Sequence, residues 1–505
     1  MGLYSVPKEI RDQKPEKTIV KKINGRFYVY EFSSTKVKKQ IDENTFKWVT
    51  KNTVGKCIGQ ITLEEGFVPN SNYIAEQDIT VIEYGSFSFL LQKTESILKL
   101  LKESFNAFDA NKIYVNALIF VIEGFCYMKN VSKYFNESCL KLQFPHTKVG
   151  YKSLHNLYSD LGRKTRLPDE FQQKLIKSCS GSVAIDGHVI ACTSENNDLS
   201  AFGYKVKKLE CKQINWLMAY DISSGTPLAS QFCNGAESDC VAVKNLFDKY
   251  DFSNVNFVVD RGFNTLECKK LMSQNGNSYI TPMVHNRKDY RDIYDKIDFN
   301  ESSEFFAYSK GKYSSIIRYQ EFNEKGIRYF AFKDMTQENM DRQLYMKNIQ
   351  KGLDGYSMEN IKESEKDFGL FLLETSNMDK TAEQIFIEYK KRWNIETFYN
   401  YIDNSLDFNA LYQQDYYSTQ GLSFIIQIAG MIYSQAKKEL KSKRTSLKDV
   451  LNELSGIKLV QVNDKWLVRN YTKQQKSLCK KLGLIIPEVF FTCFTHLKRA
   501  KGVNK

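Results

Sequence analysis

The sequence lacks the usual marks of a secreted, zinc-binding or membrane-spanning protein. Its eleven cysteines form no Cys-x-x-Cys pair and follow no regular spacing. Their odd number favours reduced thiols in a cytosol over a disulfide framework or a zinc ribbon. The N-terminal stretch MGLYSVPKEIRDQKPEK has no apolar segment of the signal-peptide kind. The longest apolar runs, Ile113–Tyr127 and Leu422–Tyr433, are shorter than a membrane span. We therefore expect a soluble cytoplasmic protein.

Internal repeats and low-complexity segments are also missing, and the 505 residues have a globular composition that favours roughly two to four compact units. Lysine and arginine number 72 against 59 acidic residues, which gives a formal net charge of +13 and a sequence pI of about 8.9. An extended polyanion is a more natural partner for such a chain than an acidic protein surface.

Two different kinds of segment precede residue 181. Residues 1–85 are predicted to form a β-rich module, because residues 18–34 alternate around Asn24-Gly25, a dipeptide typical of type I′ hairpins, and residues 46–62 form another β segment. Residues 86–180 have helical periodicity. Short helices near residues 131–142 and 152–161, followed by a basic tail, resemble a helix-turn-helix that contacts DNA. An ordinary helical layer fits the same pattern.

Strand patterns begin at residue 182 and place acids at the predicted strand ends. In SVAIDGHVIAC an apolar run leads to Asp186, and in NVNFVVDRGF another leads to Asp260 and a glycine turn into a helix. A three-strand meander followed by alternating strands and helices predicts, over residues 181–285, a mixed sheet with helices on both faces. Ligand and catalytic groups of such sheets lie at strand ends, although both acids could simply cap the next element.

The second half of the predicted fold is interrupted. Residues 286–366 contain a hairpin-like pair rich in Tyr, Phe, Arg and Lys and are interpreted as a β-rich insertion. The core is expected to resume over residues 367–440, with a strand at residues 368–374 and one helix over residues 389–407. Residues 441–505 form a tail with small helices and a β pair.

The predicted helix over residues 389–407 carries Tyr389, Arg392 and Glu396 at offsets of 0, 3 and 7. These offsets fall within about 60° of arc, so the three side chains share one face beside an apolar stripe. An ordinary ion pair on a helix surface is the simpler explanation. The two upstream acids favour a functional one, because three converging carboxylates repel one another unless cations neutralise them. Such hard oxygen ligands suit Mg²⁺ or Mn²⁺. Two such ions about 4 Å apart support in-line phosphoryl transfer.

At these residues the chain resembles the DDE transposases of bacterial insertion sequences, in the branch whose RNase H-like (retroviral-integrase-like) core is interrupted by a β-rich insertion. That branch carries a tyrosine, two residues, arginine, three residues, glutamate, six residues and lysine. Tyr389, Arg392 and Glu396 match it, whereas Asp403 occupies the lysine position. The runs IDGH, SENNDLSAFGYK and QINWLMAYDISSGTPL, together with VVDRGFN, are similar to the motifs around the two aspartates.

The resemblance implies metal-dependent cutting at terminal inverted repeats and joining of the 3′ ends to target DNA, with a homodimer in the DNA complex. Asp186, Asp260 and Glu396 are then catalytic and hold the metals. Five further residues are interpreted as DNA contacts, although a solvated basic strand fits the run around residues 204–212 equally well. These are Tyr389, Arg392, Lys205, Lys207 and Arg261.

Several alternatives stay open on the sequence. A catalytically impaired DNA-binding protein and a stand-alone nuclease are the competing functions. No tryptophan lies in the insertion, so a hairpin route of cleavage would need an aromatic such as Phe305 or Tyr313. His188 could touch the site, although a satisfied or exposed histidine is favoured. Asp403 is expected to bring a negative charge toward DNA, which favours a weakened enzyme.

Overall fold

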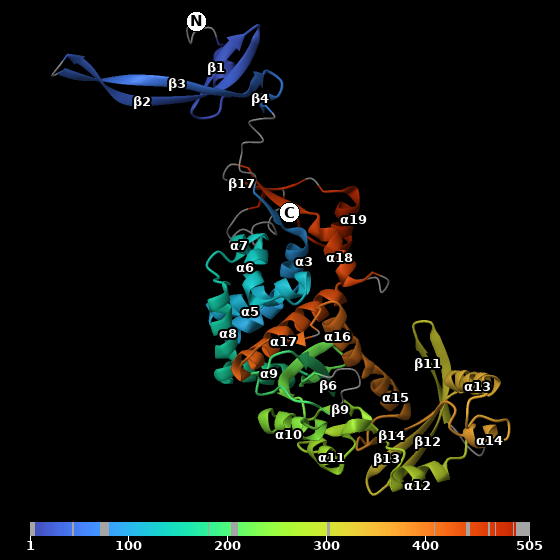
Figure 1. Cartoon of the computed structure of the whole chain (residues 1–505). Helices are drawn as coiled ribbons and strands as arrows, with labels where there is room; N and C mark the ends of the chain where they lie inside the picture. Colours follow the sequence, from blue (N-terminus) through green and yellow to red (C-terminus); the bar gives the residue numbers. More distant parts are fainter. Residues whose placement is uncertain are drawn as a thin grey trace. The chain divides into compact units, whose positions relative to one another are not determined.

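The computed structural model divides into two compact units (Figure 1), residues 1–81 with 460–464 and residues 82–459 with 465–505. It describes residues 6–42, 45–70, 80–179, 181–203, 211–299, 304–408, 410–440, 445–462, 465–469, 471–487 and 489–490. Within these ranges, no helix is both long enough and apolar enough to cross a bilayer.

The first unit is built on an antiparallel sheet of order β1-β2-β3-β4. Its elements are α1 (Lys8–Arg11), β1 (Thr18–Ile23), β2 (Arg26–Asp42), β3 (Thr45–Thr62) and β4 (Gly66–Pro69). The predicted hairpin is present, since Ile23 pairs with Arg26 and both turn residues have positive φ, 49° at Asn24 and 81° at Gly25. This backbone suits a type I′ turn. Val20, Val29, Ile58 and Ile61 belong to the small core of this unit.

A helical layer follows in the second unit, as the periodicity predicts. Its members are α3 (Gly85–Lys93), α4 (Glu95–Ser104), α5 (Ala107–Glu123), α6 (Met128–Asn136), α7 (Leu140–Gln143), α8 (Tyr151–Arg163) and α9 (Arg166–Ser178). The α8 helix packs tightly on α17 (Tyr416–Lys438), because a Cβ added to Gly162 would lie 2.0 Å from the Tyr417 carbonyl oxygen. The apolar face of α8 is therefore used in the core, and DNA contact by its other face stays a prediction.

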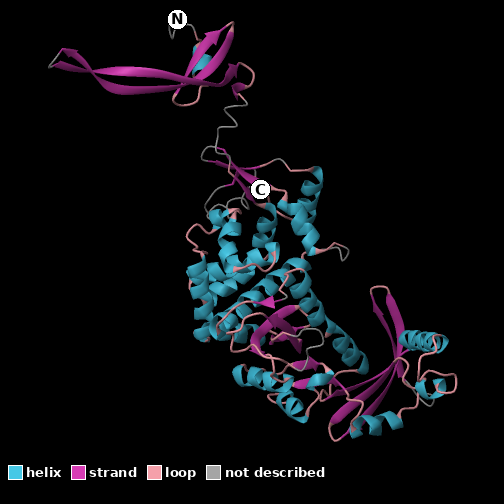
Figure 2. Cartoon of the chain, in the orientation of Figure 1, coloured by secondary structure: helices cyan, strands magenta, loops and turns pink. Residues whose placement is uncertain are grey.

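The second unit is organised around a large mixed sheet (Figure 2) with the strand order β11-β12-β13-β14-β10-β9-β6-β7-β8, and β15 beside β6. The strands are β6 (Ser182–Cys192), β7 (Gln213–Asp221), β8 (Thr226–Asn234), β9 (Asn256–Val259), β10 (Ser278–Pro282), β11 (Glu304–Lys310), β12 (Tyr313–Glu324), β13 (Ile327–Asp334), β14 (Leu370–Thr375) and β15 (Ala410–Leu411). The pairs β6–β9, β9–β10 and β15–β6 are parallel. Every residue of β7 is buried, as expected for a central strand covered on both faces.

The β-rich insertion is part of the same sheet. Its strands β11, β12 and β13 continue outward from β14, and β13 pairs with β14 in antiparallel register. Six helices lie between β8 and β14 in the described part of the chain. They are α10 (Asp239–Lys249), η2 (Arg261–Phe263), α11 (Leu266–Met272), α12 (Lys288–Lys296), α13 (Met335–Gln350) and α14 (Ile361–Ser364). The insertion therefore widens the core sheet instead of forming a separate one.

Two local predictions are wrong. The strand containing Asp186 does not end there but continues to Cys192, because β6 goes on pairing with β7 as far as Ala191. The predicted single helix over residues 389–407 consists of α15 (Ala382–Lys391) and α16 (Trp393–Asn404), separated at Arg392. A capping box of Thr381 and Gln384 sets the earlier start of α15.

The C-terminal part contains α18 (Leu447–Ser455), β16 (Lys458–Val462), β17 (Lys465–Val468), α19 (Lys473–Leu482) and β18 (Val489–Phe490). These strands and β5 (Val81–Glu83) form a small sheet of order β18-β17-β16-β5. The predicted β pair of the tail is therefore present as β16 and β17.

Candidate active site

Parallel pairing of two core strands brings Asp186 and Asp260 together. Ile185 of β6 is opposite Val259, the last residue of β9. Asp186 and Asp260 directly follow this pair of residues, so the two acids lie at the same level of neighbouring strands. This register places the two acids side by side as expected, although only Asp260 lies at a strand end.

The α15–α16 segment contributes the other polar residues of the site. Arg392 lies at the break between the two helices and is 9% exposed. Its Nη2 donates to Glu396 Oε1 at 2.6 Å, and its guanidinium carbon lies 5.9 Å from the centre of the Tyr389 ring. Ile395 and Ile402, which are fully buried, anchor α16 in the core. Tyr389, Arg392 and Glu396 therefore share one face, as their spacing predicts.

The charges of these residues act on one another. Burial raises the pKa of Asp186 to about 6, and the nearby Asp260 and Glu396 carboxylates push in the same direction. Arg392 and the Gly187 N–H, 2.9 Å from Asp186 Oδ1, oppose this rise. Burial by itself would lower the pKa of Arg392, but Asp260, Glu396 and the other acidic groups around it raise that pKa above its usual value. The Arg392 guanidinium thus supplies positive charge to three carboxylates.

The donor set fits a divalent cation in its chemistry. In the ranges that the structure describes, no three His, Cys, Asp or Glu side chains are close enough together to hold a metal ion, and Glu396 is turned toward Arg392. The half-buried Asp186, whose pKa is raised, nevertheless forms an oxygen-rich, electronegative site together with Asp260 and Glu396. Carboxylate oxygens of this kind are the ligands that Mg²⁺ and Mn²⁺ prefer.

Asp403, at the position where the resembling branch has lysine, is paired within the protein. Its Oδ1 lies 2.8 Å from His188 Nε2. The His188 ring stacks on Tyr399, with centroids 4.6 Å apart and planes inclined by 13°, and the Tyr399 hydroxyl donates to the Asp186 carbonyl oxygen at 2.8 Å. This contact ties α16 to β6, and the expectation that Asp403 brings a negative charge toward DNA stays a prediction. His188 is a satisfied histidine, the alternative that the sequence favours.

A fourth carboxylate lies beside the site and was missed by the sequence reasoning. Asp239 begins α10, and Cβ atoms added to Gly187 and Gly262 would lie 3.5 Å and 3.4 Å from its two carboxylate oxygens. It thus borders both the residue after Asp186 and the turn after Asp260. Asp239 follows no strand pattern, and nothing in the sequence distinguishes it from an ordinary acid in the first turn of a helix.

The remaining predicted site residues differ in how far they can be placed. Arg261 is exposed and directly follows Asp260 in η2. Lys205 and Lys207 lie outside the described residues. Their contribution to DNA binding stays a prediction.

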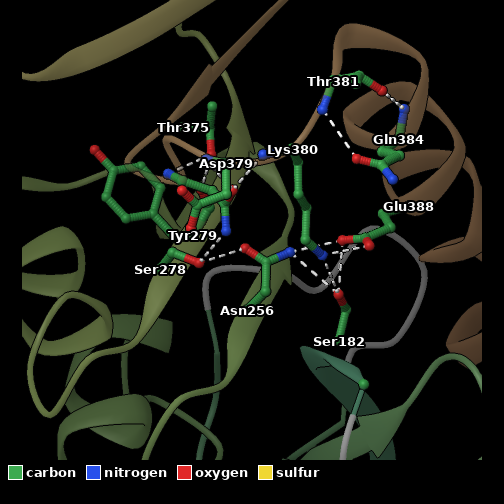
Figure 3. A network of polar contacts seen from close by, with 12 residues as sticks. Ser182, Asn256, Ser278, Tyr279, Thr375, Asp379, Lys380, Thr381, Gln384 and Glu388 are labelled. Atoms are coloured by element: carbon green, nitrogen blue, oxygen red, sulfur yellow. Dashed lines mark hydrogen bonds and ion pairs between the residues drawn. The ribbon is translucent and has the colours of Figure 1, made fainter.

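A polar network fastens α15 to the starts of the core strands (Figure 3). Glu388 Oε2 accepts from Ser182 Oγ at 2.7 Å and from Asn256 Nδ2 at 2.7 Å, and Glu388 also pairs with Lys380. Ser182 and Asn256 begin β6 and β9, whereas the aspartates lie further along. The network therefore fixes α15, and with it Tyr389, relative to the strands that carry the acids.

These features define an RNase H-like α/β core with an inserted β-rich segment and an acidic site. A family model described as the transposase DDE domain matches residues 177–432, just over half of the chain and including Asp186, Asp260 and Glu396. The chain belongs to this family of DDE transposases. No curated protein matches the sequence. Among solved structures, the chain is similar to the piggyBac transposase in a synaptic complex with hairpin DNA, determined by cryo-EM. The identity is 12% and the TM-score 0.38, over 74% of this chain and 80% of that chain.

Proposed function

We propose that this protein is the transposase of a bacterial insertion sequence, which cuts DNA at the terminal inverted repeats of its element and joins the 3′ ends to target DNA. The observation that carries the proposal is the convergence of Asp186, Asp260 and Glu396 around Arg392 in a chain of the DDE transposase family. The protein would act in the cytoplasm on double-stranded DNA, as a homodimer bound to a pair of ends.

The proposed chemistry consists of two phosphoryl transfers. A water oxygen attacks the phosphorus at the element end and the 3′ oxygen leaves as a hydroxyl; that 3′ hydroxyl then attacks a target phosphodiester and expels the target 3′ oxygen. Asp186, Asp260 and Glu396 would hold two Mg²⁺ or Mn²⁺ ions. When bound, the ions neutralise the carboxylates and stabilise charge on the attacking and leaving oxygens.

The cationic and aromatic residues of the site would orient the DNA. With Glu396 holding a metal ion, Arg392 would be available to a terminal phosphate, and its position beside the Tyr389 ring would limit the directions in which it can point. Arg261, next to Asp260, and Lys205 and Lys207, in the run before β7, would contact the backbone on either side.

The test is a strand-transfer assay with oligonucleotides that carry the element's flanking terminal repeats, in Mg²⁺ or Mn²⁺. We expect Asp186→Ala, Asp260→Ala and Glu396→Ala to abolish nicking and joining while DNA binding is largely retained. Asp251→Ala is a matched control, because this exposed aspartate precedes β9 and so lies at the other end of the strand from Asp260.

The same assay separates the proposal from the two other functions. Wild-type protein that bound end DNA but never nicked it would be a DNA-binding relative without catalysis. Wild-type protein that nicked but never joined would be a nuclease of the same fold. Substantial metal-dependent cleavage by any of the three alanine variants would contradict the assignment of the acids.

A further inference from the structure

The first unit carries a long two-stranded arm, and no residue of this arm belongs to the acidic site described above. It consists of residues 32–42 of β2 and 45–54 of β3, paired from Phe32 with Val54 to Asp42 with Thr45. Figure 1 shows the two strands continuing together beyond β1 and β4. β1 pairs with β2 only at residues 26–31, and β4 pairs with β3 only at residues 59–62. Among the described residues, the arm therefore has two open edges.

The arm contributes nothing to a hydrophobic core. The core of this unit uses residues at the base of the sheet, such as Val29, Ile58 and Ile61, and residues 33–40 and 46–54 are all exposed. Isolated two-stranded ribbons are at best marginally stable in water, and open strand edges are normally covered or shielded by charge. Neither face of this long ribbon packs on the core of its unit, so we interpret the ribbon as an element that binds a partner.

The two faces of the arm differ in chemistry. Cross-strand pairs share a face, and Lys36 opposite Thr50, Lys38 opposite Trp48 and Gln40 opposite Phe46 define one of them. Trp48 is 64% and Phe46 is 50% exposed, and the Lys38 ammonium lies 4.7 Å from the centre of the Phe46 ring. The other face pairs Val37 with Val49 and Lys39 with Lys47. Lysines thus occur on both faces, and the large aromatic side chains on one.

The charge of the arm favours a polyanion as its partner. Residues 32–54 contain five lysines and two acids, and the acids are adjacent in the sequence at residues 42 and 43. Two copies of this surface placed face to face would set lysines against lysines, which is unfavourable. The major groove of duplex DNA admits a two-stranded ribbon. At about 3.3 Å per residue the arm is about 33 Å long, close to one turn of duplex.

We propose that the β2–β3 arm is a DNA-binding element that lies along a groove of duplex DNA, with its lysines on phosphates and with Trp48 and Phe46 against sugars and bases. This inference deepens the proposed function, on which it rests for the identity of DNA as the partner. Lysine contacts with phosphates make binding depend on salt, whereas aromatic contacts add affinity that salt changes little.

The experiment measures binding of the full-length protein to a 40-base-pair duplex by fluorescence anisotropy, with EDTA present and over a series of salt concentrations. We expect Lys36→Gln/Lys38→Gln to weaken binding roughly 10- to 100-fold and to lower the slope of log K against log salt by about 2, at ~0.9 for each phosphate that a lysine no longer neutralises. Trp48→Ala should weaken binding roughly 5- to 100-fold with an unchanged slope. Because the arm supplies no core residue, these variants should fold.

Lys21→Gln/Lys22→Gln is the matched control. It removes the same charge from exposed positions on β1 in the same unit, and its affinity should stay within about threefold of the wild-type value if the arm is the contact. The proposal is overturned if both arm variants bind as tightly as this control. It is also overturned if Trp48→Ala abolishes self-association in sedimentation while DNA affinity is unchanged, since the arm would then join two copies of the chain.

Failure of this inference differs from failure of the proposed function. The binding assay contains no divalent metal and needs no cleavage. DNA binding that depends on the arm, without any strand transfer, would support the arm as a DNA-binding element and contradict the transposase activity. Strand transfer by a protein whose DNA binding does not depend on the arm would support the transposase activity and contradict the arm as a DNA-binding element.

Discussion

Replacing Asp186 by Asn should make the metal-free protein more stable at neutral and alkaline pH, although the variant would lose activity. Burial, reinforced by Asp260 and Glu396, raises the pKa of Asp186 from an ordinary value of 3.8 to about 6. The folded protein therefore holds a proton on this carboxyl more tightly than the unfolded chain does. Ionising Asp186 costs folded-state stability, and asparagine, which resembles the neutral acid, avoids that cost.

The pH range and the size of the effect follow from the same shift. The cost is nearly absent below about pH 4, grows as the pH rises through the interval between the two pKa values, and is complete above about pH 7. At ~1.36 kcal/mol per pKa unit the cost is at most about 3 kcal/mol, and because solvent screens a half-buried group we expect a value between about 1 kcal/mol and this upper bound.

Urea unfolding followed by tryptophan fluorescence measures the difference in free energy of unfolding. Asp186→Asn should exceed wild type by about 1–3 kcal/mol at pH 8 and by less than about 1 kcal/mol at pH 4. Mg²⁺ should raise the stability of wild type more than that of Asp186→Asn. The control is Asp198→Asn at an exposed position. Equal stability of Asp186→Asn and wild type at pH 8, or a gain that is the same at pH 4 and pH 8, would refute the reasoning.

Two other substitutions test the packing around the site. Gly421→Ala should cost about 1–3 kcal/mol or more in thermal unfolding, because its Cβ would lie 2.0 Å from the Tyr158 carbonyl oxygen. Gly150→Ala, where a Cβ meets nothing within 4 Å, should be nearly neutral, and equal stability of the two variants would contradict the close helix packing. Asp403→Ala removes the hydrogen bond to His188 and should cost about 1–2 kcal/mol, whereas Asp403→Asn should cost less; an alanine variant as stable as wild type would show that this contact does not hold α16 to β6.

Much of the site can be predicted from the sequence because its signals are local. Tyr389, Arg392 and Glu396 lie within two helical turns of one another, so their spacing alone places them on one face, even across the break at Arg392. Asp260 follows a short buried strand, and Asn24-Gly25 determines its hairpin through the positive φ of both residues. Each of these features depends on dihedral angles and hydrogen bonds within a few residues.

Contacts between distant parts of the chain were decided only by the tertiary structure. Asp403 contacts His188 across 215 positions, and this contact gives the aspartate a structural partner that its place in the sequence does not indicate. Asp239 reaches the site because α10 begins beside two glycines that lack a Cβ. Asp186 lies inside its strand because β7 continues to pair beyond it. Periodicity carries no information on such contacts, since they depend on which elements pack together and in what register.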